Sequence, residues 1–237
     1  MTLRPDKDDT WKELGYVFVV AYARSGSTLL QSLINSCPGV QIRGENYNAL
    51  YHLYRAIAAV GAARDERGDA RTSAPDDPWH GADLIKPRMF EARLLQGFVR
   101  RVLAPAPETR VTGFKEIRYN PLFVPDDQFA PYMDFLLTAF PRARIVFNSR
   151  RAEDVATSSF VARQDPARVI DWVGQTDARF ASFAAGSDRA IVMRYEDYIA
   201  DHRLIHRMLD FLGLDWTPEA VERVFAKPLT HAKARDP

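Results

Sequence analysis

The most constraining feature of this chain is a buried strand that runs through a short polar loop directly into a helix. Residues 16–20 form an aromatic and β-branched run, typical of a strand buried on both faces. From Thr28 onward, apolar residues recur with the period of a helix. The loop Arg24-Ser25-Gly26 lies between them. Because such a loop directs backbone N–H groups and the positive end of a helix dipole at one point, the sequence predicts a phosphate-binding site.

This loop differs from the phosphate loop of nucleoside triphosphatases. That loop has the pattern G-x-x-x-x-G-K-[ST], in which the lysine contacts the terminal phosphates. Here Ala21 occupies the first glycine position and Ser27 the lysine position, while Arg24 is the nearby cation. The missing lysine disfavours a kinase or an ATPase. A tight turn that uses serine and glycine only as turn formers is the structural alternative.

Composition limits the possible functions. The chain has 237 residues, 46% of them hydrophobic and 27% charged, which predicts one soluble domain spanning residues 1–237. A net charge of +1 gives no support for nucleic-acid binding, so any anion site must be local. Cys37 is the single cysteine, which excludes an intrachain disulfide and a cysteine-based metal cluster. With neither a signal-peptide core in residues 1–13 nor an apolar run of membrane-spanning length, we expect a bacterial-type cytoplasmic protein.

Strand and helix patterns alternate along the chain. The predicted strands are residues 16–21, 40–43, 110–114, 143–148 and 190–194. The predicted helices are residues 28–36, 48–60, 90–103, 132–140, 153–161, 169–184, 203–212 and 219–225. This alternation predicts a three-layer α/β/α fold with a central parallel sheet of about five strands, and ligands bind such sheets at the carboxyl ends of the strands. Residues 61–81 are predicted to be a flexible loop or a lid, and residues 227–237 a flexible tail.

A second strand-to-helix junction carries another candidate anion site. Arg150 follows the fourth predicted strand, and Ser158 is placed about two turns into the predicted helix that follows. A guanidinium offers a planar pair of donors to phosphate oxygens, and a hydroxyl can add a third. A solvated arginine and a helix-surface serine are the structural alternative.

The two junctions together resemble the 5′-phosphosulfate loop and the 3′-phosphate motif of sulfotransferases. The resemblance extends from Tyr16 to about Phe225 and is strongest to a bacterial group that is similar to carbohydrate and protein-tyrosine sulfotransferases. It implies a P-loop-containing fold, 3′-phosphoadenosine 5′-phosphosulfate (PAPS) as donor, the product 3′-phosphoadenosine 5′-phosphate (PAP), and no metal. The implied nucleotide-binding residues are Arg24, Ser25, Gly26, Ser27, Thr28, Arg150 and Ser158.

The chain departs from the sulfotransferases that act on small phenols. Their loop has a lysine and a tryptophan where this chain has Arg24 and Leu29, and the chain has no Arg-Lys-Gly element of the kind that completes their nucleotide site.

The resemblance also suggests the catalytic groups. Sulfuryl transfer resembles phosphoryl transfer, in which positioning and charge stabilisation dominate. We expect Glu45, at the rim of the second strand, to be the general base, Arg24 to contact the bridging oxygen and Lys115 to stabilise the transferring group, with Arg118 nearby.

Each of these assignments has an alternative. Glu45 can instead be an acid near the start of the following helix, and His52 is the rival base. Lys115 and Glu116 can form a surface ion pair of little energetic weight.

The sequence therefore predicts a sulfotransferase that acts on a small-molecule or carbohydrate hydroxyl. Its alternatives are a small kinase with a degenerate phosphate loop and a non-catalytic nucleotide-binding protein. Five aromatic residues near the expected cleft would suit stacking on an acceptor: Tyr47, Tyr51, Tyr54, Trp79 and Tyr119. Neither the acceptor nor the oligomeric state follows from the sequence.

Overall fold

The computed structural model describes residues 10–68 and 74–227, and the chain divides into two compact units. A helical unit comprises Met1–Trp11 and Asn48–Ala104, and an α/β unit comprises Lys12–Tyr47 and Pro105–Pro237. That the chain is a single domain stays a prediction.

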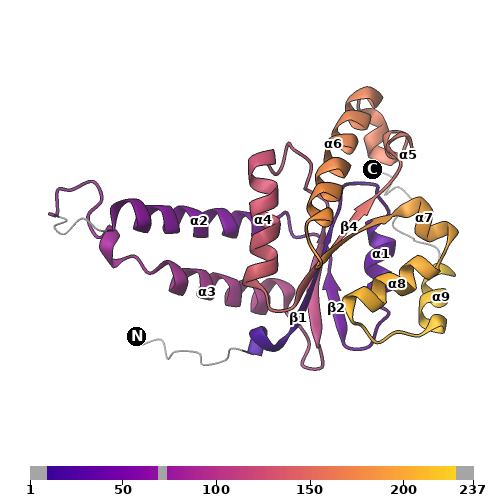
Figure 1. Ribbon diagram of the computed structural model, residues 1–237, viewed down its shortest axis with the longest axis horizontal. Helices are drawn as coiled ribbons and strands as arrows, with labels where there is room; N and C mark the ends of the chain where they lie inside the picture. Colours follow the sequence, from indigo (N-terminus) through magenta and orange to yellow (C-terminus); the bar gives the residue numbers. More distant parts are fainter. Residues whose placement is uncertain (1–9, 69–73, 228–237) are drawn as a thin grey trace. The chain divides into compact units, whose positions relative to one another are not determined.

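The α/β unit is built on one parallel sheet of five strands, as the alternating pattern predicts (Figure 1). The strands are β1 (Gly15–Val20), β2 (Val40–Arg43), β3 (Val111–Glu116), β4 (Ala143–Ser149) and β5 (Ala190–Arg194). Their order across the sheet is β2-β3-β1-β4-β5. The chain leaves β1 towards one edge of the sheet, whereas β4 and β5 lie on the other side of β1. Such a reversal of direction opens a crevice at the carboxyl ends of the strands, and the β1 and β4 loops meet there.

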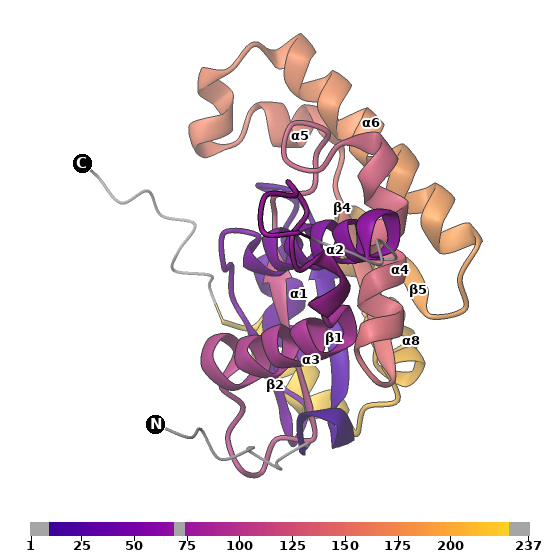
Figure 2. The same ribbon diagram turned by 90° about the vertical axis from the view of Figure 1, so that its left-hand side faces the viewer.

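The two faces of the sheet are covered by different helices (Figures 1 and 2). The cores beneath them differ in composition. One face packs against α1 (Ser27–Ile34), α8 (Arg203–Leu212) and α9 (Pro218–Phe225), and its buried side chains are mostly aliphatic. The other face packs against α4 (Asp126–Ala139) and α6 (Pro166–Ala185) through aromatic rings. Successive strand residues alternate between these faces. Val17 and Val19 therefore join the aliphatic core, while Phe18 joins the aromatic one.

The helix predicted over residues 153–161 is wrong as a single element. The structure has a short α5 (Ala152–Ala156), a turn, and a 3₁₀ helix η4 (Ser159–Arg163), and Ser158 lies between them with extended backbone (φ −95°, ψ 120°). The Thr157 hydroxyl donates to the Glu153 carbonyl at 3.0 Å. Bonds of this kind compete with helix propagation. A further short helix, α7 (Tyr195–Ala200), follows β5 directly.

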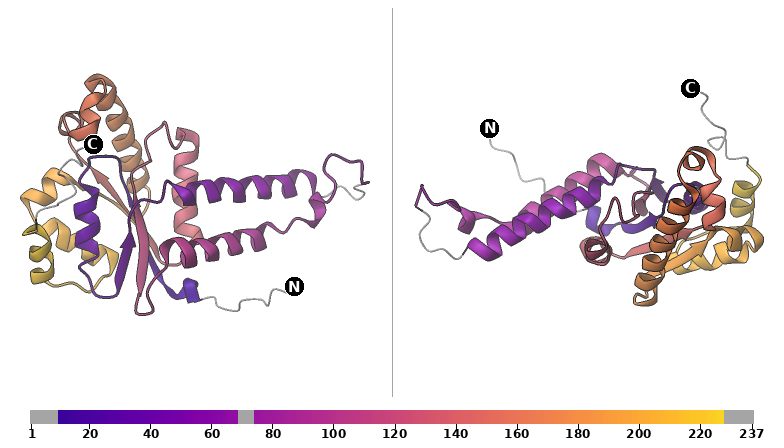
Figure 3. Two further views of the ribbon diagram at one scale, coloured as in Figure 1. Left: turned by 180° about the vertical axis from the view of Figure 1, so that it is seen from behind. Right: turned by 90° about the horizontal axis from the view of Figure 1, so that it is seen from above.

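The helical unit contains two antiparallel helices that lie side by side (Figure 3). They are α2 (Ala49–Arg67) and α3 (Pro87–Phe98), and they are accompanied by η1 (Thr10–Glu13), at the boundary of the units, η2 (Ala82–Leu84) and the π-helical η3 (Val99–Leu103). Because α2 runs on to Arg67, residues 61–67 of the predicted loop are helical. Residues 69–73 of that loop and 228–237 of the predicted tail lie outside the described residues.

Among the described residues, no helix has the length and apolarity needed to cross a bilayer.

Gly113 in β3 has no room for a side chain. A Cβ built there would lie 1.8 Å from the Val17 carbonyl oxygen of the neighbouring strand. We expect Gly113→Ala to lower the free energy of unfolding by about 3 kcal/mol or more, because backbone must shift in the centre of the sheet. Urea unfolding measures this. The control is Gly174→Ala, at an exposed position of α6 where a Cβ meets nothing within 4 Å, and it should be neutral or stabilising by up to about 1 kcal/mol. Equal losses in both variants would contradict the packing argument.

Candidate active site

The loop after β1 is held in a conformation that only glycine suits at one position. Gly26 has φ +84° and caps the N-terminus of α1, and a Cβ there would lie 2.2 Å from the Tyr195 ring. Arg24 also has a positive φ, of +67°, which is uncommon for a residue with a side chain. The Ser25 hydroxyl donates to the Tyr22 carbonyl at 2.8 Å and closes the turn. The first N–H groups of α1, those of Ser27 and Thr28, have no acceptor within the helix by geometry. This arrangement is typical of sites that bind anions at the start of a helix.

A buried amide ties this loop to the neighbouring strand. Asn148, near the end of β4, donates from Nδ2 to the Ser25 carbonyl at 2.6 Å. Its Oδ1 accepts from the Tyr198 hydroxyl at 3.1 Å, which fixes the orientation of the amide. This role of Asn148 was not predicted from the sequence. The signal was a lone amide at the end of the apolar run 145–147.

Tyr22 joins the two loops at a second point. Its hydroxyl donates to the Arg150 carbonyl at 3.0 Å and accepts from the Arg150 backbone N–H at 2.8 Å. Burial raises the pKa of the Tyr22 phenol, so the proton needed for donation is retained. The backbone of Arg150 is therefore fixed relative to the loop after β1.

Three of the side chains predicted to bind the nucleotide, those of Arg24, Arg150 and Ser158, come together. Arg150 donates from Nη1 to the Arg24 carbonyl at 3.0 Å, and its guanidinium carbon lies 4.7 Å from the centre of the Tyr195 ring. Arg24 donates from Nε to the Ser158 hydroxyl at 2.9 Å. Ser158 reaches this position from the turn after α5 and not from within a helix. The buried Arg150 Nε has no hydrogen-bond partner among the described residues, so one donor is still available.

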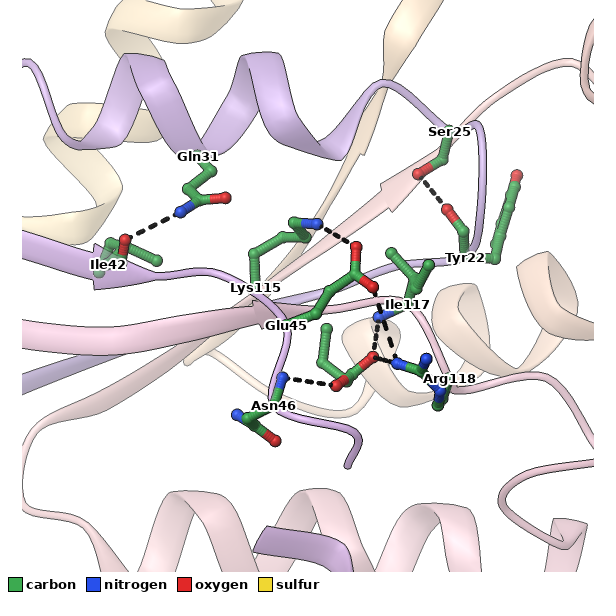
Figure 4. A network of polar contacts seen from close by, with 10 residues as sticks. Tyr22, Ser25, Gln31, Ile42, Glu45, Asn46, Lys115, Ile117 and Arg118 are labelled. Atoms are coloured by element: carbon green, nitrogen blue, oxygen red, sulfur yellow. Dashed lines mark hydrogen bonds and ion pairs between the residues drawn. The ribbon is translucent and has the colours of Figure 1, made fainter. Parts of the chain in front are cut away.

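Glu45 and Lys115 form an ion pair at the carboxyl ends of β2 and β3 (Figure 4). The Lys115 ammonium lies 2.6 Å from Glu45 Oε1. The Lys115 side chain is only 6% exposed, whereas that of Glu45 is 35% exposed. Lys115 is thus held inside the protein, while its partner faces the solvent.

Glu116 is a fully buried carboxylate that organises the same rim. It accepts hydrogen bonds from the backbone N–H groups of Asn46 and Ile117 at 3.0 and 2.8 Å, and from Arg118 at 2.9 Å (Figure 4). The surface pair of Lys115 with Glu116, the alternative weighed from the sequence, is wrong. Adjacent strand residues point to opposite faces, so Lys115 pairs with Glu45 and Glu116 with Arg118. The importance of Glu116 was missed because its partners come from two loops.

These groups line one cleft of about 230 Å³. Its walls include the loop from Ala23 to Leu29 together with Glu45, Lys115, Arg150 and Tyr195. Three cationic side chains thus face a single carboxylate, which favours an anionic ligand. His52, the rival base, lies on an exposed face of α2 in the helical unit. No cluster of histidine, cysteine and acidic side chains that could hold a metal ion occurs in the part of the chain that the structure describes.

Comparison with known proteins agrees with this geometry. Residues 17–218 match the model of the sulfotransferase family. The chain belongs to the sulfotransferase family. No match was found among curated protein sequences.

Two solved structures share the fold. The sulfotransferase domain of the Synechococcus PCC 7002 olefin synthase is 18% identical, with a TM-score of 0.54 over 94% of this chain and 81% of that one. The sulfotransferase domain from the curacin biosynthetic pathway is 18% identical, with a TM-score of 0.50 over 87% of this chain and 76% of that one. At this level of identity the likeness shows that the P-loop-like α/β fold of these sulfotransferase domains is shared.

Asp177 of α6 is a partly buried carboxyl whose ionisation is disfavoured. Burial, and secondarily the nearby Glu196, raise its pKa to about 6, although Tyr22 and Arg194 act in the opposite direction. An unfolded aspartate has a pKa of about 3.9. Between these values the folded protein binds more protons than the unfolded chain, so this group makes the protein less stable as the pH rises from about 4 to about 6.

We therefore expect Asp177→Asn to gain stability relative to the wild type as the pH rises from 4 to 6, with the difference constant above that range. Urea unfolding at a series of pH values measures it. Asp171→Asn, which removes an exposed carboxylate from the same helix, is the matched control. A pH-independent difference between Asp177→Asn and the wild type would show that the folded-state pKa is not raised.

Proposed function

We propose that this sulfotransferase transfers the sulfuryl group of PAPS to a hydroxyl acceptor. The observation that carries the proposal is the cleft at the carboxyl ends of the strands, where an anion-binding loop, three cations and one carboxylate meet. The loop supplies backbone donors for one phosphate, and a second strand-to-helix junction supplies a guanidinium for another.

The residues present fit such a nucleotide. The free Nε of Arg150 is a buried donor that a 3′-phosphate oxygen would satisfy, with the Ser158 hydroxyl beside Arg24 as a further donor. The 5′ end would be held by Gly26, Ser27 and Thr28, because the N–H groups that open at the start of α1 lie there. Ser25 would shape this loop, since its N–H and its hydroxyl both donate to the Tyr22 carbonyl.

The chain's own groups can then carry the reaction. Bound PAPS would supply a sulfuryl group attached to a stable leaving group, the phosphate of PAP. Glu45 would accept the proton of the acceptor hydroxyl. Arg24 and Lys115 would stabilise negative charge on the bridging and sulfuryl oxygens. The contact between Glu45 and Lys115 would keep the base next to the cation. This suits the reaction, because the attacking hydroxyl and the sulfuryl group that it attacks must also lie next to each other.

The acceptor in this proposal is a hydroxyl of a small molecule or a carbohydrate. A glutamate base suits aliphatic hydroxyls, whose protons must be removed during the attack.

Binding of PAP tests the nucleotide assignment. We expect calorimetry without metal to show binding that depends on the 3′-phosphate, with AMP and ATP binding more weakly. Arg150→Ala should weaken PAP binding by roughly 10- to 150-fold, because it removes charge-assisted hydrogen bonds worth about 1.5–3 kcal/mol. Arg151→Ala is the matched control, since it removes the same charge from a side chain that is more than half exposed. A preference for Mg²⁺-ATP would overturn the proposal in favour of a kinase.

Replacement of Glu45 tests the base. Glu45→Gln should lower kcat by about 10²–10⁴-fold, because the amide cannot accept the proton, while PAP affinity stays near the wild-type value. The measurement is sulfation by labelled PAPS across a panel of phenols, sugars and alcohols. Glu45→Asp keeps the carboxylate and should retain more activity than Glu45→Gln. If Glu45→Gln is as active as the wild type, the base is another residue.

A further inference from the structure

We propose that Tyr47 is a specificity-determining residue that stacks on a flat ring of the acceptor beside Glu45. The acceptor would then carry its hydroxyl on, or next to, an aryl or pyranose ring. This inference rests on the proposed function, because it concerns the acceptor side of the same cleft.

Tyr47 is fixed next to the acidic and basic groups of the rim. The guanidinium carbon of Arg118 lies 4.1 Å from the centre of the Tyr47 ring. The same guanidinium lies 2.9 Å from the buried Glu116 and 3.7 Å from Glu45 Oε2. Arg118 therefore links the position of the ring to the position of the proposed base. Its own position is fixed in turn by Glu116.

The ring is exposed although it is held in place. Tyr47 is 78% exposed, so its aromatic surface is largely in contact with water. Burial of aromatic surface is a main source of stability in proteins and interfaces. Within this chain only a small part of the Tyr47 ring is buried. A rigid, exposed tyrosine has the properties of a ligand-binding side chain, because it offers a large contact surface at low entropic cost.

The backbone of Tyr47 gives independent support. Tyr47 has φ +58°, and the next residue, Asn48, has φ +59°. Asparagine tolerates this left-handed region, whereas for a bulky residue such as tyrosine it is an outlier. Strain of this kind persists only where the surroundings enforce it, and it is concentrated at functional sites. At Tyr47 it coincides with an exposed ring next to the cleft.

The structure distinguishes Tyr47 from the other aromatic candidates. Tyr51 and Tyr119 are buried, and Tyr54 and Trp79 belong to the helical unit. Phe160 lines the cleft that contains Glu45, and it is 54% exposed. Within the described α/β unit, Tyr47 and Phe160 thus provide exposed aromatic surface near the base. An acceptor with a flat ring matches this surface better than an open-chain alcohol.

The experiment compares three acceptors with PAPS as donor: 4-nitrophenol, methyl β-glucoside and 1-hexanol. Tyr47→Asn removes the ring but suits the left-handed backbone, and Tyr47→Phe keeps the ring as the matched control. We expect Tyr47→Asn to raise KM for a ring acceptor by about tenfold with kcat within about twofold, as loss of a stacking contact would do. Tyr47→Phe should resemble the wild type, and turnover of 1-hexanol should not respond to either change. The nitrophenol and glucoside arms separate an aryl acceptor from a sugar.

Failure of this inference is distinguishable from failure of the proposed function. If PAP binds and 1-hexanol is sulfated while both ring compounds are not, the nucleotide assignment stands and the assignment of Tyr47 is overturned. Equal changes in KM for ring and open-chain acceptors in Tyr47→Asn, or the same loss in Tyr47→Phe, would also overturn it. If PAP itself does not bind, the proposed function fails first.

Discussion

The site depends on the hydrogen bonds that join the loop after β1 to the end of β4. Asn148 holds the Ser25 carbonyl, and the Tyr22 hydroxyl holds both backbone groups of Arg150. Because β1 and β4 are neighbours in the sheet, these donors and acceptors lie within hydrogen-bond distance, and the bond from Asn148 is fully buried. They join the loops that follow two separate strands into the one wall of the cleft to which the proposed anion site belongs. Without them, the left-handed backbone of Arg24 would relax.

The rim formed by β2 and β3 depends on a different interaction, a buried carboxylate that is surrounded by its hydrogen-bond donors. A carboxylate with no exposed surface is costly unless its oxygens are hydrogen-bonded. Glu116 meets this condition with two backbone N–H groups and Arg118, and it thereby fixes the start of the segment that leads to Tyr47. The loop after β1 is thus joined to β4 by neutral groups together with the Arg150 guanidinium, whereas the rim of β2 and β3 is held mainly by charged groups.

The sequence was sufficient for the parallel sheet, and it also indicated which charged side chains lie together at the carboxyl ends of the strands. The boundaries of β2 and β5 were predicted correctly, because β2 is a short alternating segment between Gly39 and Gly44 and β5 is an apolar run after a polar turn. The clustering of Arg24, Arg150 and Ser158 was predicted from strand ends that share one edge. Asn148, Tyr198 and Glu116 were missed, since their roles depend on partners from distant segments. The break after α5 was missed because side-chain bonds such as that of Thr157 compete locally with a periodic pattern that continues through it.

The ion pair of Lys115 with Glu45 connects the two halves of the site. A nearly buried ammonium needs a counter-charge, and Glu45 provides it from the solvent-facing side. An anionic donor in the same cleft would provide a second counter-charge for Lys115, and the ion pair between Lys115 and Glu45 would then weaken. Glu45 would become available to a hydroxyl at the time when Lys115 engages the donor. In the proposed reaction, one lysine would therefore couple the base to the donor, and this role would account for a cation buried so deeply at the edge of an open cleft.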